Sequence, residues 1–99
     1  MLYVIIGRDA PGSLATRRRV RGEHLERIRS LVDAGRIALA GPFPATDSSD
    51  PGDAGFSGSL IVGEFDSLEA AREWIAQDPY VTEGVFDTVD VRPFIKVLP

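Results

Sequence analysis

The sequence has 99 residues, with no cysteine, a single histidine and no long apolar run. Without cysteine the chain can form no disulfide, thiolate nucleophile or zinc-thiolate site, so its chemistry depends on oxygen groups and one imidazole. No stretch approaches the roughly 20 apolar residues that cross a bilayer, and we expect no membrane partner. The first residues lack a basic leader with a long apolar segment, so we expect a cytoplasmic protein.

Basic residues are also few relative to acidic ones, and the net charge is -4. A negative chain is poorly suited to a polyanion, so we expect no nucleic-acid partner. The one basic run, RRRVR from Arg17 to Arg21, stands near Glu23 and Glu26 and is interpreted as a solvated helix face. The alternative is an anion-binding patch, for which a small organic anion is better suited than a polymer.

Hydrophobic periodicity and turn residues predict six elements in a single domain covering residues 1–99. The expected strands are Leu2–Arg8, Arg36–Phe43, Phe56–Phe65 and Val85–Leu98, and the expected helices run from about Ala15 to Ala34 and from Asp66 to Gln77. The first helix carries one apolar stripe, made of Val20, His24, Leu25, Ile28, Leu31 and Val32. Asp66 and Glu69 form a pattern typical of a capping box, and Pro79 is expected to end the second helix. The polar stretch Pro44–Gly55 is expected to be a loop.

The order βαββαβ predicts an α+β, ferredoxin-like fold, in which a four-stranded antiparallel sheet carries both helices on one face. The strand that contains Gly41 and Pro42 is expected at a sheet edge, because proline lacks a ladder donor. The segments LYVII and SLIVGEF have apolar residues at both even and odd positions, so each strand presents apolar side chains to both faces of the sheet. The face without helices therefore also needs cover. A second copy of the chain would supply it, and we expect a homodimer that packs sheet against sheet as a dimeric α+β barrel. The alternative is a monomer with a few exposed valines.

His24 and Asp78 are the leading candidates for chemistry. Asp78 falls at the expected end of the second helix, where the dipole disfavours a carboxylate. Since both helices lie on the same sheet face, a histidine on the first and a carboxylate leaving the second can approach each other. An aspartate that accepts from one ring nitrogen leaves the other as a general base or acid. The alternatives are a structural histidine and an exposed turn aspartate.

Three further residues are candidates for binding a substrate. Ser59 lies on the third strand, Tyr80 follows Asp78 by two residues, and Arg8 ends the first strand, where it could hold a substrate carboxylate. The alternative roles are close packing for Ser59 and cover of the core edge for Tyr80. The acidic residues Asp47, Asp50 and Asp53 lack the pattern of a calcium loop, and we expect no metal site.

The chain resembles the YCII-like family of small dimeric α+β barrel proteins. The segments that carry the resemblance are EHLERIRSLVDAGRIALAGPF, SGSLIVGEFDSLEAAREWIAQDPY and GVFDTVDVRPF. The resemblance implies a ferredoxin-like subunit, a dimer and a pocket built around a histidine-aspartate dyad, here His24 and Asp78, with Ser59 nearby. It also implies kinship with dehydrochlorinases of chlorinated aromatics and, more widely, with muconolactone isomerases and cofactor-independent monooxygenases.

Two functional hypotheses follow. The first is a small enzyme without a cofactor that performs elimination or isomerisation on a small cyclic or carboxylated molecule, with His24 as the base and Asp78 as its orienting partner. Ser59 or Tyr80 would then bind the substrate. The second is a non-catalytic homodimer that binds a metabolite or supports another protein, with the dyad as a buried ion pair. The fold alone does not decide between them.

Overall fold

The structure, a computed structural model, describes residues 1–99. In chain order the elements are β1 (Leu2–Asp9), α1 (Leu14–Asp33), β2 (Ile37–Pro44), a short 3-10 helix η1 (Gly52–Ala54), β3 (Phe56–Glu64), α2 (Leu68–Ala76), α3 (Pro79–Thr82) and β4 (Phe86–Phe94). No helix is long and apolar enough to cross a membrane.

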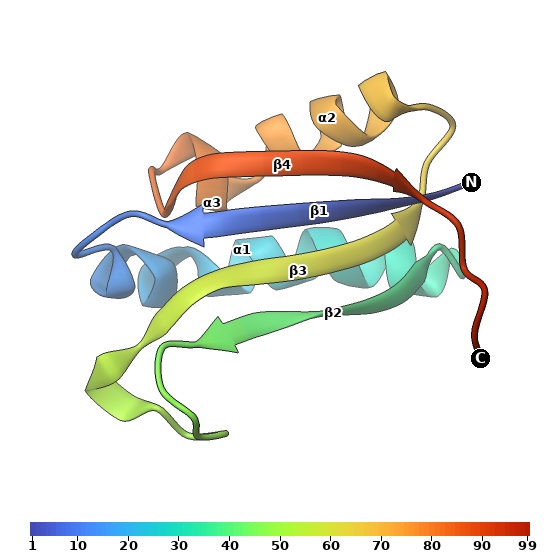
Figure 1. Cartoon of the computed structure of the whole chain (residues 1–99). Helices are drawn as coiled ribbons and strands as arrows, with labels where there is room; N and C mark the ends of the chain where they lie inside the picture. Colours follow the sequence, from blue (N-terminus) through green and yellow to red (C-terminus); the bar gives the residue numbers. More distant parts are fainter.

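The strands form one antiparallel sheet in the order β2-β3-β1-β4. Helices α1 and α2 lie behind this sheet in Figure 1, so they cover one of its faces and leave the other open toward the viewer. The βαββαβ order and the ferredoxin-like arrangement predicted from the sequence are therefore confirmed. The edge position predicted for the strand with Gly41 and Pro42 is also confirmed, because β2 has a neighbour on one side only.

The core lies between the inner face of the sheet and the helices. Strand β1 shows the alternation that produces it, since Tyr3, Ile5 and Gly7 are buried whereas the residues between them are half-buried on the opposite face. One connected cluster of 12 buried residues joins the sheet to α1, α2 and α3. The helices are therefore held to the sheet by a common core, which positions the side chains that they carry.

Some element ends differ from the prediction. Helix α2 begins at Leu68, two residues after Asp66, because Ser67 is the N-cap and its hydroxyl accepts a hydrogen bond from the backbone nitrogen of Ala70. Val32 was placed on the buried stripe of α1, but it is 52% exposed. Val32 lies in the last turn of α1. Strand β4 ends at Phe94, short of the predicted Leu98.

The most consequential difference concerns Asp78. The prediction placed it at the end of one helix, with Pro79 as the stop signal, whereas it is the N-cap of the additional helix α3. Proline suits the first position of a helix, because its φ angle is already helical and its missing N–H needs no partner there. The carboxylate therefore caps the start of a helix, where a negative charge is favoured, as well as following the end of α2.

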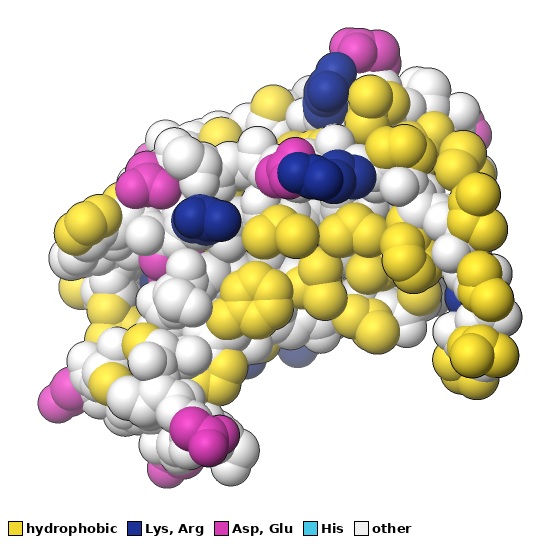
Figure 2. Space-filling view, in the orientation of Figure 1, with side chains coloured by type: hydrophobic (Ala, Val, Ile, Leu, Met, Phe, Trp, Pro, Cys, Tyr) yellow, Lys and Arg dark blue, Asp and Glu magenta, His cyan; other side chains and the backbone are white.

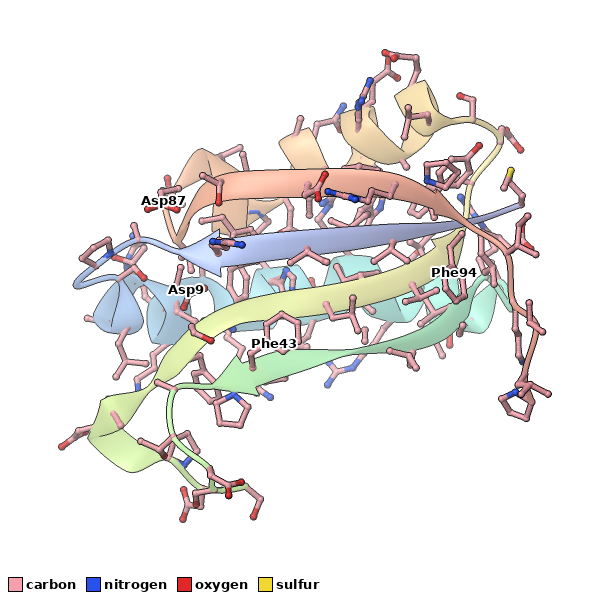
Figure 3. The ribbon with its side chains drawn as sticks, in the orientation of Figure 1. Asp9, Phe43, Asp87 and Phe94 are labelled. Carbon is pink, nitrogen blue, oxygen red and sulfur yellow. The ribbon has the colours of Figure 1, made fainter.

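The open side of the sheet is named here the outer face. Its apolar side chains, from the strand register, are Leu2, Val4, Ile6, Leu39, Phe43, Leu60, Val62 and Phe94. Figure 2 shows hydrophobic side chains gathered on this face, and Figure 3 shows Phe43 and Phe94 toward opposite ends of it. Phe43 and Phe94 are 37% and 43% exposed, so the apolar surface predicted to need cover is uncovered in the single chain.

Candidate functional site

His24 lies near the middle of α1 on its buried side. The buried residues of this helix are Arg17, Val20, His24, Ile28 and Leu31, which recur at three- and four-residue spacing and thus share one face. This periodicity explains why the imidazole is only 5% exposed although α1 is rich in charge. The same face brings His24 against α3, where the aspartate lies.

The predicted contact between His24 and Asp78 is present in the structure. Nδ1 of His24 lies 2.8 Å from Oδ1 of Asp78, and both side chains are buried. The same Oδ1 accepts a hydrogen bond of 2.9 Å from the backbone nitrogen of Tyr80, and Oδ2 accepts one of 3.0 Å from Arg27. The fully buried carboxylate is therefore compensated by three hydrogen-bond donors, one of which is the guanidinium group of Arg27.

This contact decides which ring nitrogen of His24 is free. An ionised carboxylate only accepts hydrogen bonds, so in the neutral imidazole the proton must be on Nδ1. The lone pair is then on Nε2, and His24 lines the pocket described below. The geometry is that of a general base whose tautomer is held by a buried carboxylate.

Tyr80 packs face to face with His24. The ring centroids are 3.8 Å apart and the planes differ by 8°. Burial raises the pKa of the Tyr80 hydroxyl and Asp78 adds to the rise, against the opposing effect of Arg17 and Arg21. Tyr80 is therefore a neutral phenol at physiological pH, able to donate a hydrogen bond at the pocket that it lines.

Arg17 is a site residue that the sequence interpretation missed. It belongs to the run interpreted as a solvated face, yet it is 4% exposed and that interpretation is wrong for it. Its Nε and Nη2 lie 2.8 Å from the two carboxylate oxygens of Asp9, and Nη2 also donates to Oγ of Ser59 at 2.9 Å. The carbonyl of Gly58 accepts from the same nitrogen at 3.0 Å.

A signal for this position existed in the sequence. Arg17 precedes Val20 by three residues and thus continues the apolar stripe by one turn. The whole basic run was assigned to one environment, although a helix turns successive residues toward different sides. Its neighbours Arg18 and Arg19 are indeed exposed and pair with Asp53 and Glu83 at the surface.

A pocket of about 230 Å³ opens between α1 and the strands β2 and β3. Of its 14 lining residues eight are hydrophobic, with Tyr80 among them, and four are polar or charged, namely Arg17, Arg21, His24 and Ser59. A cavity of about 150 Å³ already holds benzene, so this volume suits one substituted six-membered ring. A mostly apolar wall with a few convergent polar groups is the usual composition of a small-molecule site.

The structure brings four of the five predicted site residues together. The residues that line the pocket are His24, Ser59 and Tyr80. Asp78 does not line it but contacts Nδ1 of His24. Arg8 is elsewhere: it is exposed and lines a depression on the outer face with Phe43. It follows Gly7 of the inner face by one residue, and the period of two in a strand directs it away from the pocket.

No group of three or more histidine, aspartate or glutamate side chains in the chain could hold a metal ion. The polar groups of the pocket are instead one imidazole, two hydroxyls and two guanidinium groups. Such a set can move a proton and hold oxygen atoms of an organic molecule.

The fold and pocket define a ferredoxin-like α+β protein whose pocket is lined by a histidine paired with a buried aspartate. Residues 1–95 match the YCII-related domain, and the chain belongs to that family. It is 55% identical to Protein YciI of Escherichia coli over 97 residues, which cover 98% of this chain and 99% of that protein. The predicted family resemblance is confirmed.

Two further similarities concern proteins whose names refer to small molecules. The chain is 31% identical to fusaric acid biosynthesis protein 2 of Gibberella fujikuroi over 94 residues, 93% of this chain and 90% of that protein. The structure is also similar to that of 5-chloro-2-hydroxyhydroquinone dehydrochlorinase from Burkholderia phenoliruptrix in complex with 2,5-dihydroxybenzoquinone, with a TM-score of 0.84 and 26% identity. That similarity covers 96% of this chain and 94% of the other.

Proposed function

We propose that this protein is a small enzyme that works without a cofactor and transfers a proton during elimination or isomerisation of a small hydroxylated ring. His24 is the general base through Nε2, and Asp78 holds its tautomer and balances the charge that it gains. Ser59 and Tyr80 are the hydrogen-bonding groups for the substrate. Proton transfer by such a pair contributes about 10²- to 10⁴-fold, and the remaining acceleration comes from holding the ring in place.

One observation carries this proposal. A buried carboxylate lies 2.8 Å from Nδ1 of a histidine that lines a pocket large enough for one substituted ring. A histidine with only a structural role has no need of a pocket beside it. The convergence of two hydroxyl groups on the same pocket supports substrate binding there.

The substrate class comes from the chemistry of the pocket and from the structural neighbour. The dehydrochlorinase removes HCl from a chlorinated hydroxyhydroquinone, as its name states. In such an elimination a base takes a proton from the substrate, electrons move through the ring, and chloride leaves with the pair of the C–Cl bond. A base with its tautomer held, hydroxyl donors and an apolar wall are the groups that this chemistry needs, and the pocket has them.

We propose also that the protein is a homodimer in which two outer faces pack together. The uncovered apolar surface supports this, because eight apolar side chains from all four strands share that face. A monomer would leave Leu39, Phe43 and Phe94 of this face exposed to water, whereas a twofold contact buries the same surface on both copies. The pocket is on the helix side of the sheet, so the dimer leaves it accessible.

The second candidate function is a non-catalytic protein that binds a metabolite. The observation that favours it is the complete hydrogen bonding of the buried polar side chains, including the Asp78 carboxylate. A satisfied ion pair of this kind can serve the fold alone. In that case His24 and Asp78 variants would lose stability without changing any turnover.

Chloride release from 5-chloro-2-hydroxyhydroquinone tests the proposed function. We expect the wild-type protein to release chloride, and His24→Gln and Asp78→Asn to reduce kcat at least about 100-fold while circular dichroism shows a folded chain. Asp87→Asn is the matched control, because Asp87 is exposed and does not line the pocket, and it should retain full activity. Binding of the compound without any chloride release would favour the second candidate, and no binding would contradict both.

A further inference from the structure

Arg17 and Ser59 form a second polar group of the pocket, on the other side of Tyr80 from His24. Arg17 and His24 are seven residues apart on the same helix face, which separates them by about 10.5 Å along the axis. The Tyr80 ring stacks on His24 at 3.8 Å and lies 4.8 Å from the guanidinium carbon of Arg17, so it stands between the two. The base and the arginine therefore face the pocket from opposite sides of one aromatic ring.

The hydrogen bond between Arg17 and Ser59 has only one possible direction. A guanidinium has donors and no acceptor, so Oγ of Ser59 accepts at 2.9 Å. The Ser59 hydroxyl proton is then left to donate, and Ser59 lines the pocket. Accepting from a cation polarises the hydroxyl and makes it a stronger donor.

The charge of Arg17 is already paired within the protein. Its charge is paired with both oxygens of Asp9 at 2.8 Å, and the two side chains are 5% exposed. Nη2 also donates to Ser59 and to the carbonyl of Gly58, whereas the two N–H groups of Nη1 are not used in these contacts. Arg17 therefore acts on a molecule in the pocket through the Ser59 hydroxyl, in addition to its unpaired Nη1 group, because Arg17 itself lines the pocket.

We infer that Ser59, oriented by Arg17 and Asp9, is the donor that holds the developing enolate or phenolate oxygen of the substrate, with Arg17 and Asp9 as positioning residues. The inference rests on the proposed function. When Nε2 of His24 takes a proton from carbon, the electron pair of that C–H bond forms a carbon-carbon double bond and the adjacent carbonyl oxygen becomes negative. The Ser59 O–H donates to this oxygen and keeps its own proton, and nothing is oxidised or reduced.

The substrate class follows from this donor. The pocket should select a planar ring with an oxygen that is ionised, or becomes ionised during reaction. Such a ring presents its oxygen to Ser59 and its acidic hydrogen to His24. A ring of the same size without an ionisable oxygen leaves the Ser59 hydroxyl unpaired and should bind more weakly.

Binding of 2,5-dihydroxybenzoquinone tests the inference, because this planar ring has two acidic hydroxyls whose ionisation changes its visible absorption. We expect Ser59→Ala to weaken binding roughly 10- to 100-fold, the range for a hydrogen bond to a charged group. The apparent pKa of the bound compound should rise by about one unit or more, because the donor that favours its ionised form is gone. A purely structural role for Ser59 would leave that ionisation unchanged.

Ser57→Ala is the matched control, since Ser57 is on the same strand but is exposed and lines the depression with Arg8 instead. It should bind the compound as the wild type does. Arg17→Lys keeps the charge but cannot pair with Asp9 and reach Ser59 in the same way. It should weaken binding in the wild-type background and have little further effect in Ser59→Ala.

The outcomes separate this inference from the proposed function. If Ser59→Ala binds the compound with wild-type affinity and ionisation while His24→Gln loses chloride release, the inference is wrong and the proposed function stands. If the wild-type protein does not bind the compound, both are wrong. If Arg17→Lys does not fold, the affinity and ionisation measured in Ser59→Ala still decide the question.

Discussion

The side chain of Asp78 accepts hydrogen bonds from three other residues of the site. Its carboxylate is fully buried and accepts from His24, Arg27 and the backbone of Tyr80. Asp78→Ala would leave these donors unpaired in the interior. We expect the free energy of unfolding to fall by about 3–5 kcal/mol, the cost of breaking a buried ion pair, as measured by urea denaturation.

The control for this prediction is Asp87→Ala, which removes an exposed carboxylate at the start of β4. A surface change of this kind should alter the free energy of unfolding by no more than about 0.5 kcal/mol. Equal effects of the two substitutions would contradict the role given to Asp78.

Tyr80 predicts a pH dependence. Because burial raises its pKa in the folded protein, the unfolded chain releases the phenolic proton first as the pH rises above 10.0. The contribution of Tyr80 to stability is therefore complete below pH 10.0 and is lost as the pH rises through the folded-state pKa. We expect the free energy of unfolding of the wild type to decline more steeply in this range than that of Tyr80→Phe, and parallel curves would contradict the burial of the hydroxyl.

At the scale of elements, the backbones of β3 and β1 are in close contact at Gly58. A Cβ atom at Gly58 would collide with the carbonyl oxygen of Gly7, which is backbone and cannot turn aside. The carbonyl of Gly58 also accepts from Arg17, and the next residue is Ser59. We expect Gly58→Ala to lower the free energy of unfolding by about 1–3 kcal/mol in a urea titration.

Gly22→Ala is the control: it is the same change of glycine to alanine, but we expect the opposite effect on the free energy of unfolding. Gly22 lies exposed inside α1, and a Cβ there meets no atom within 4 Å. Alanine is the better helix former by about 1 kcal/mol, so this substitution should raise the free energy of unfolding. Destabilisation by both substitutions would contradict the steric explanation for Gly58.

Elements set by a repeating pattern were predictable from the sequence. Strands β1, β2 and β3 and helix α1 were expected within one residue of their observed bounds, because apolar periodicity extends over many residues of each, whereas β4 was predicted four residues too long at its end. Helix α3 has four residues, too few to show a period, and its only signal was the pair Asp78-Pro79. The pairing of Asp78 with His24 was therefore predicted, whereas its position as the N-cap of α3 was not.

The part of the site built from charge pairs was less predictable. The sequence does not distinguish a buried arginine from an exposed one unless its partner is known. The partner of Arg17 is Asp9, which lies on β1 whereas Arg17 lies on α1. The contact depends on how α1 lies across the end of β1, which follows from packing of the whole domain. Arg8 was predicted at the pocket, but it directly follows Gly7 of the inner face, and the alternation of side chains along β1 places it on the outer face.

At the scale of the whole molecule, the outer face predicts the oligomeric state. Val4→Lys would place a charge at the centre of this face, opposite Val62 and Arg92 on the neighbouring strands. We expect the wild type to sediment as a dimer at micromolar concentration and Val4→Lys as a monomer, because an unpaired lysine is costly to bury.

Val89→Lys introduces the same charge at an exposed position on the helix side of the sheet, where it lines a depression beside Ile75. This variant should remain a dimer. A wild-type monomer, or a dimer that survives Val4→Lys, would contradict packing through the outer face.

The central claim is that Asp78 holds the His24 proton on Nδ1 and thereby leaves Nε2 as the base at the pocket. Nitrogen NMR of His24, the only histidine in the chain, measures this directly, because protonated and unprotonated ring nitrogens have different shifts. At a pH where the ring is neutral, we predict a protonated Nδ1 and an unprotonated Nε2 in the wild type, and a mixture of tautomers in Asp78→Asn. A wild-type imidazole with its proton on Nε2 would contradict the account.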